Sequence, residues 1–200
     1  MPRHPTHRSL PVFALALTLA ALPFTALPTP APAETARAET AIVPEKNPPG
    51  DIPDTQAFVD YLATGDYTLK VPEGWARSDV AGGVSFVAKL DGVTVTLTAT
   101  ASAPSIASVK ASYLPAMVAA GRAVEVSSVK SVDLPGGPAI RIDYSANSEP
   151  NAVTNKQIRL EANRYLFFKS GKVAALDLYA PFGADNVDQW NLMSQSFQWK

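Results

Sequence analysis

The chain has 200 residues, and its 17 basic and 18 acidic residues nearly cancel. The two signs are interspersed and form no basic stripe, which argues against a nucleic-acid or anionic-membrane surface. There is no cysteine, so disulfides are excluded and no lipid-accepting cysteine is available for a bacterial lipoprotein anchor. We therefore expect one domain that is stabilised by burial alone, and we expect it to be a monomer.

The first 33 residues have the order of parts typical of a secretory signal. A basic, acid-free start at residues 1–9 precedes an apolar run from Leu10 to Leu22, and Ala31 and Ala33 form a small-residue cleavage site. The alternative is a membrane anchor, but the uninterrupted run is only about a dozen residues and a spanning helix needs about 20. We predict a signal peptide at residues 1–33, cleaved after Ala33, and hence a secreted, extracytoplasmic protein of the cell envelope.

Both histidines, His4 and His7, lie in this predicted signal peptide. The mature chain would contain neither histidine nor cysteine, which excludes Ser-His and Cys-His nucleophilic pairs and metal sites built on imidazole or thiolate. With Arg3 and Arg8 removed, 15 basic residues would face 18 acidic ones, a net charge of −3. We predict a non-enzymatic protein with no catalytic, cofactor-binding or metal-binding residue.

Residues 34–54 are rich in Ala, Thr, Glu and Pro, and they include Asn47-Pro-Pro-Gly50. Such a composition buries too little apolar surface to become ordered, so we predict a flexible linker followed by a single globular domain at residues 55–200. The domain should begin with a short amphipathic helix over Thr55–Leu62, which Gly65 ends.

The clearest strand starts at Tyr67, where apolar and polar residues alternate. Tyr67, Leu69 and Val71 share one face, as expected for a strand with one buried side. Pro72 lacks a backbone N–H and ends the ladder, and Trp75 can then fold back onto the buried face.

A hairpin is predicted next. Residues 84–90 and 93–100 are rich in β-branched residues and flank Asp91-Gly92, a dipeptide typical of hairpin turns. The second run places four threonines on one face. A threonine row could bind ice or carbohydrate, but it is more often the solvated face of a strand, which is what we expect here.

Two helices are predicted further along the chain. Ser105 caps the first, and Pro115 should kink or break it near Tyr113. Asp185 caps the second, which buries Trp190. Further strands are predicted at residues 123–134, 139–145, 156–169 (with a bulge near Asn163) and 172–180, and an extended segment at 196–199 closes the chain.

One cluster of charged residues is predicted on the middle strands. If residues 139–145 and 156–169 pair antiparallel, Arg141 can face Glu161 and Asp143 can face Arg159, with Asp177 joining from the next strand. Arginines can hold a carboxylate or phosphate, and two carboxylates can act as an acid–base pair in sugar hydrolysis. Because these charges balance, we expect solvated cross-strand ion pairs instead, each worth about 0.2–1 kcal/mol.

The order of elements resembles that of the Mog1/PsbP superfamily over residues 57–200. The residues that carry the resemblance are Tyr67, Leu69, Val71, Pro72, Gly74, Trp75, Trp190, Ser196 and Phe197. Within the superfamily, the chain is most similar to uncharacterised exported PsbP-like and LpqN-like lipoproteins of actinobacteria. The resemblance implies an α+β fold in which helices flank an antiparallel β-sheet, an α/β/α sandwich, and a non-enzymatic role in binding or assembly. Unlike those lipoproteins, the chain lacks the lipid-accepting cysteine, so we expect no lipid anchor.

Three functions remain open at this point. We expect first a binding or accessory domain of the cell envelope, which contacts an unidentified envelope protein or ligand. One alternative is a small-ligand carrier with a pocket between sheet and helices near Tyr113, Tyr165 and Trp190. The other is a carboxylate-dependent glycan hydrolase that uses Asp143 and Glu161.

Overall fold

The computed structural model describes residues 39–200. The predicted signal peptide and residues 34–38 of the predicted linker lie outside the described residues and stay predictions. None of the described helices is long and apolar enough to cross a membrane.

The strands are β1 (Phe58–Ala63), β2 (Tyr67–Pro72), β3 (Ala76–Val80), β4 (Gly83–Ala88), β5 (Asp91–Ala99), β6 (Glu125–Leu134), β7 (Gly137–Asn147), β8 (Arg159–Lys169), β9 (Lys172–Pro181) and β10 (Gln198–Trp199). The helices are α1 (Ile106–Ser108), the π-helix η1 (Val109–Tyr113), α2 (Leu114–Ala120) and α3 (Val187–Ser196).

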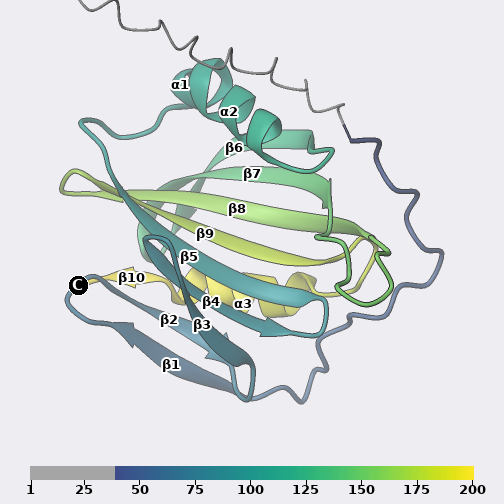
Figure 1. Cartoon of the computed structure of the whole chain (residues 1–200). Helices are drawn as coiled ribbons and strands as arrows, with labels where there is room; N and C mark the ends of the chain where they lie inside the picture. Colours follow the sequence, from purple (N-terminus) through teal and green to yellow (C-terminus); the bar gives the residue numbers. More distant parts are fainter. Residues whose placement is uncertain (1–38) are drawn as a thin grey trace, which may run out of the picture. The chain divides into compact units, whose positions relative to one another are not determined.

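The described strands form two antiparallel sheets. The large sheet has seven strands in the order β3-β4-β5-β9-β8-β7-β6, and the small sheet has three in the order β1-β2-β10. In Figure 1, α1 and α2 lie over one face of the large sheet, while α3 and the small sheet lie on its other side. The predicted α+β class is confirmed, and the separate small sheet is an addition that the sequence did not predict.

The face of the large sheet toward α3 and the small sheet, here called the core face, holds the main hydrophobic core. Val93, Phe167 and Leu176 come from three different strands and are all 0% exposed. Tyr67, Leu69 and Val71 of β2 are buried against the same core, as their alternation predicted. The ring of Phe197, between α3 and β10, stacks on that of Phe167 at a centroid distance of 4.3 Å, which joins the end of the chain to the large sheet.

The opposite face, here called the helix face, is crossed by α1, η1 and α2, which together form the helical segment. Ser105 caps the start of this segment, as predicted, and forms a capping box with Ser108 that was not predicted. The irregularity expected from Pro115 takes the form of the π-helix η1, which ends just before it. Val109 is the one residue of the segment that is fully buried.

Residues 39–54, here called the strap, are bound to the domain and differ from the flexible linker that their composition predicts. Two buried asparagines hold the strap near its ends. The side-chain amide of Asn147 accepts from the N–H of Ile42 and donates to the carbonyl of Thr40. The side-chain amide of Asn186 likewise accepts from the N–H of Ile52 and donates to the carbonyl of Gly50. Since Ile52 is also buried, a few polar and apolar contacts outweigh the strap's low hydrophobicity.

Residues 55–62 do not form the predicted helix. Phe58–Ala63 is strand β1, and all six of its residues pair with β2. The three-residue spacing of Phe58 and Tyr61 suits a helix. In the structure this segment instead forms backbone hydrogen bonds with the edge of β2, and both rings still pack against the core. Tertiary pairing overrides the local pattern here.

Three local predictions are also wrong. The hairpin turns at Lys89-Leu90 and not at Asp91-Gly92, because Ala88 pairs with Asp91. Asn163 pairs regularly with both neighbouring strands, so β8 has no bulge there, and its side chain lines a small polar cavity. A bulge lies instead in β6, between Val126 and Ser128. Asp185 does not cap α3, because Asn186 occupies the N-cap position and uses its side chain to hold the strap.

Candidate functional site

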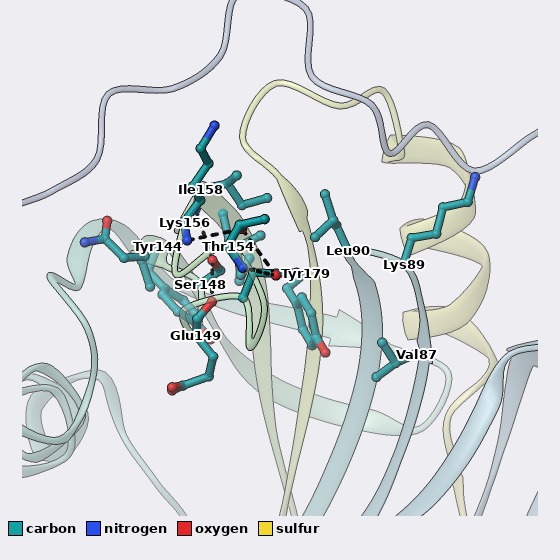
Figure 2. A pocket seen from close by; sticks show the side chains of 15 residues that line it. Val87, Lys89, Leu90, Tyr144, Ser148, Glu149, Thr154, Lys156, Ile158 and Tyr179 are labelled. Atoms are coloured by element: carbon teal, nitrogen blue, oxygen red, sulfur yellow. Dashed lines mark hydrogen bonds between the residues drawn. The ribbon is translucent and has the colours of Figure 1, made fainter.

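An open cavity lies on the helix face beyond the end of the helical segment. Its volume is about 600 Å³, within the range of about 300–1,000 Å³ typical of small-molecule sites. No residue of the helical segment lines it. Figure 2 shows the lining, which comprises Val87, Lys89, Leu90, Tyr144, Ala146, Asn147, Ser148, Glu149, Asn151, Thr154, Lys156, Ile158, Leu160, Ala162 and Tyr179.

The floor of the cavity follows from a cross-strand row of large and small residues. Tyr144 pairs with Ala162, Ala162 with Tyr179, Tyr179 with Gly92, and Gly92 with Val87. Neighbours in such a row touch across the sheet, so an alanine between two tyrosines leaves a hollow between two rings. The row therefore makes an apolar depression across five strands.

Gly92 serves this row and not a turn. A Cβ atom at Gly92 would lie 2.0 Å from Cζ of Tyr179, so the tyrosine ring occupies the space that any other residue would need. A glycine within a strand often marks such a close approach. The Asp91-Gly92 dipeptide thus fixes a ring at the wall of the cavity.

A polar row lies beside the floor, on the side of the helical segment. The Arg164 guanidinium donates to both carboxylate oxygens of Asp177, at 2.6 and 2.7 Å, and to the Tyr113 hydroxyl at 3.1 Å. The Tyr144 hydroxyl donates to the same carboxylate at 3.2 Å. Arg164 thereby links the helical segment, through Tyr113, to the floor of the cavity.

The two tyrosines and the arginine of this network each keep one protonation state near neutral pH. Burial, reinforced by Asp177, raises the pKa of Tyr144 well above its ordinary value, and burial also raises the pKa of Tyr113. Burial lowers the pKa of Arg164, but the Asp177 charge and its hydrogen bonds outweigh that effect and raise it overall. None of these groups is poised to exchange a proton, so the arrangement suits structure and binding better than acid–base catalysis.

The rim of the cavity carries an excess of positive charge. Lys89 stands on the β4–β5 turn and Lys156 on the loop between β7 and β8, so that the two flank the opening from different walls (Figure 2). Glu149 is the one acid in the lining, and Arg122 holds it at 2.8 Å and keeps its pKa low. The ion pairs found for lysines in residues 39–200 involve Lys70, Lys130 and Lys172, and neither rim lysine.

The loop wall has its own internal hydrogen bonds. The Asn151 carboxamide oxygen accepts from the N–H groups of Val153 and Thr154, both at 3.0 Å, and the Asn151 N–H donates to the carbonyl of Lys156. This Asx-type turn explains why a polar, glycine-free loop holds a defined shape. Lys156 is therefore placed by the backbone of the loop.

The charge cluster expected on β7 and β8 forms with other partners. Tyr165 lies opposite Arg141 and Asn163 opposite Asp143, so the register differs by four residues from the expected pairing. Arg141 pairs with Asp143 along its own strand, because both side chains point to the core face.

Arg159 and Asp177 of that cluster have separate surroundings. The Arg159 guanidinium is buried and donates to Glu125, Ser145, Asn147 and the carbonyl of Ala123. Asp177 belongs to the network of Arg164 on the helix face.

Asp143 and Glu161 are not brought together in a cleft, as sugar hydrolysis would need. Glu161 lines a cavity of about 170 Å³ beside α3 and accepts from the N–H of Gly183. Asp143 does not line that cavity and is bound by Arg141 and Lys130. Although burial raises the pKa of Glu161, its proposed partner is neutralised elsewhere.

Tyr113, Tyr165 and Trp190 do not line one common pocket, as the carrier hypothesis expected. Tyr113 lies on the helix face and lines a cavity of about 410 Å³ between the helical segment and the sheet, whereas Tyr165 and Trp190 lie on the core face, where Trp190 lines the cavity of about 170 Å³. The sheet itself separates them.

The threonines expected on a solvated strand face are partly covered instead, since the Thr94 hydroxyl is hydrogen-bonded to that of Ser85 and Thr96 is half-buried.

Sequence reasoning missed the residues that shape the observed cavity. Tyr179, Ala162 and the two rim lysines carry no motif, because they meet only through the strand register. One signal was present: a glycine directly before a β-branched run, as at Gly92, can mark a close contact as well as a turn.

Comparison with known proteins agrees with this architecture. No protein-family model and no curated protein sequence matches the chain. Among solved structures, it is similar to the solution structure of cyanobacterial PsbP (CyanoP) from Synechocystis sp. PCC 6803, with a TM-score of 0.51 and 16% identity over 77% of this chain and 100% of that one. The chain has the PsbP fold. LpqN, a protein involved in cell envelope biogenesis of Mycobacterium tuberculosis, is also similar, with a TM-score of 0.43 and 15% identity over 72% of this chain and 90% of that one.

The PsbP-like fold predicted from the resemblance is thus confirmed. At these identities the likeness concerns the fold alone, because one fold can host unrelated functions. Function has to be argued from the cavity and its surroundings.

Proposed function

We propose that this chain is an exported accessory domain of the cell envelope that acts by binding, and that the open cavity is its binding site. The observation that carries the proposal is the cavity of about 600 Å³, set on rigid strands and left uncovered by the helical segment. A concave apolar site with a few polar groups at its rim is the usual form of a ligand site. Export rests on the predicted signal peptide, and we expect the secreted form to be a monomer.

The non-enzymatic part of the proposal rests on the chemistry of the residues. From residue 39 onward the sequence contains no histidine and no cysteine. The polar groups beside the floor, in Arg164, Asp177 and Tyr144, already satisfy one another. Groups that already bind one another in this way suit the positioning of a ligand-binding surface better than proton transfer.

Two experiments test the proposal. The full chain is first produced in a secreting bacterium and its amino-terminus is sequenced, and we expect the mature protein to begin at Glu34. Recovery of unprocessed chain from the cytoplasm would contradict the assignment to the envelope.

The second experiment tests the cavity with a matched pair of variants. Ala146→Trp places an indole in the cavity, whereas Ala76→Trp places one on the exposed edge strand β3. Envelope material captured by the wild-type protein should be retained by the Ala76 variant and lost by the Ala146 variant. Equal capture by all three proteins would show that binding occurs elsewhere.

A further inference from the structure

The cavity combines an apolar interior with a rim of one charge sign. We infer that its ligand is an amphipathic anion, a small molecule with an apolar body and a carboxylate or phosphate end. This inference rests on the proposed function, since it names the class of ligand for that same site.

The interior accounts for the apolar body. Val87, Leu160 and Ala162 line it together with the rings of Tyr144 and Tyr179. The Tyr144 hydroxyl is already bound to Asp177, so the ring presents carbon to the cavity. An apolar group that enters gains the usual stabilisation of about 25 cal/mol per Å² removed from water.

The rim accounts for the charge of the other end. Lys89 and Lys156 flank the opening, and within residues 39–200 neither forms an ion pair, although Lys89 is close enough to the buried Asp91 to act on its charge. Glu149 is the one acid of the lining, and it is held by Arg122, which also pairs with Glu39, so the two lysines still outnumber the acids of the lining. Beside the floor, the charges of Arg164 and Asp177 cancel.

The positive charge at the rim is opposite in sign to the net charge of the domain. The mature chain is expected to carry a net charge of −3, so a positive opening is not a consequence of overall composition. Lys89 and Lys156 stand on different walls, so an anionic group at the opening has a positive side chain on either side of it. Lysine is a mobile point charge, so this arrangement selects for charge and not for the planar geometry that arginine recognises.

The test uses four probes that share one twelve-carbon chain, each kept below its micelle concentration. Dodecanoate and dodecyl phosphate are the anions, dodecyl maltoside is neutral, and dodecyltrimethylammonium is a cation. Binding to the full chain is measured by calorimetry at low salt and again at about 0.5 M salt, where charges are screened beyond about 3–5 Å. We expect both anions to bind at least tenfold more tightly than the neutral probe, the cation to bind least, and the preference to shrink at high salt. The two anions distinguish a free fatty acid from a phosphate head group.

Two lysine variants and one control complete the design. Lys89→Glu and Lys156→Glu should each weaken dodecanoate binding about fivefold and leave the neutral probe within about twofold. Lys110→Glu changes the same charge on the helical segment, where it lines none of the cavities described here, and should have no effect.

The outcomes separate the inference from the proposed function. If all four probes bind alike and Ala146→Trp abolishes their binding, the cavity is a binding site but the anionic class is wrong. If Ala146→Trp changes nothing, or no probe binds to the wild-type protein, both fail. Equal losses in the Lys89, Lys156 and Lys110 variants would also overturn the role of the rim, because they would reflect overall charge alone.

Discussion

The two faces of the large sheet are covered to different extents. On the core face, residues such as Phe167 and Leu176 are 0% exposed, and the ring of Phe197 stacks on those of Tyr67 and Phe167 and meets Trp199 edge-on. On the helix face, only Val109 of the helical segment is fully buried, and the far end holds an open cavity. The core face therefore holds the larger hydrophobic core, whereas the helix face combines a smaller one, which includes Ile142 and Leu166, with an open cavity.

Neighbouring phenylalanines on β8 give the sharpest test of this difference, and the largest expected effect. Phe167 points into the core, whereas Phe168 is half-buried on the helix face, where it lines a groove beside α1. We expect Phe167→Ala to lower the free energy of unfolding by about 3–5 kcal/mol and Phe168→Ala by about 1 kcal/mol. Denaturant unfolding of both variants measures the values. Equal losses would show that the two faces contribute alike.

The second prediction concerns the ion pair beside the cavity. Asp177→Ala leaves the largely buried Arg164 guanidinium without its counter-charge, and we expect a loss of about 2–4 kcal/mol. Replacing both residues by leucine should cost less than the single change, because no charge is then left buried. An exposed pair serves as the control: Asp60→Ala, which frees Lys70 on the small sheet, should cost at most about 0.5 kcal/mol. A double variant less stable than the single would contradict this reasoning.

The third prediction concerns Asp91, which is 7% exposed beneath the strap and whose Oδ1 has no hydrogen-bond partner among the described residues. Burial raises the pKa of Asp91 to about 7. The negative charge of Asp51 on the strap adds to this rise, and the positive charge of Lys89 on the same hairpin partly offsets it. Tyr179 also faces it, as a neutral phenol. Because the raised pKa belongs to the folded state, the folded protein holds a proton that the unfolded chain has lost. Stability should therefore fall as the pH rises from about 4 to about 7.

Asp91→Asn should remove this dependence. We expect the variant to be about 1–3 kcal/mol more stable than the wild type at about pH 8 and nearly equal to it at about pH 4. Hydrogen exchange of the Ile52 amide, which Asn186 holds in the strap, reports whether the strap responds first. Asp79→Asn on the exposed edge strand β3 is the control. An unchanged slope in the Asp91 variant would show that this carboxyl does not titrate as described.

Much of the core face could be predicted from the sequence, and little of the helix face. Alternation identified the buried side of β2, because period-2 burial is local information. The pairing of Arg141 with Tyr165 could not be read in the same way, since register depends on the length and turns of the loop at residues 148–158. The cavity depends wholly on register, through the row from Tyr144 to Val87. The strap escaped notice for a related reason: Asn186 holds it from more than a hundred residues away.

The last prediction concerns the helical segment, whose few buried contacts leave it dependent on local hydrogen bonds. The Ser105 hydroxyl accepts from the Ser108 N–H at 3.1 Å, and the Ser108 hydroxyl accepts from the Ser105 N–H at 2.9 Å. Ser105→Ala breaks this capping box, and we expect it to cost about 1 kcal/mol, the usual value for a lost N-cap. Hydrogen exchange should become faster in η1 and α2 before it becomes faster in β8, because the segment packs on the sheet with one fully buried residue, Val109, and otherwise with partly buried side chains such as Tyr113 and Met117. Ser112→Ala, which removes only a hydroxyl bonded within the segment to the carbonyl of Ser108, is the matched control. If both variants make hydrogen exchange in β8 faster by the same amount, the helical segment does not open before the sheet does. The two faces would then differ in the shape of their surfaces and not in local stability.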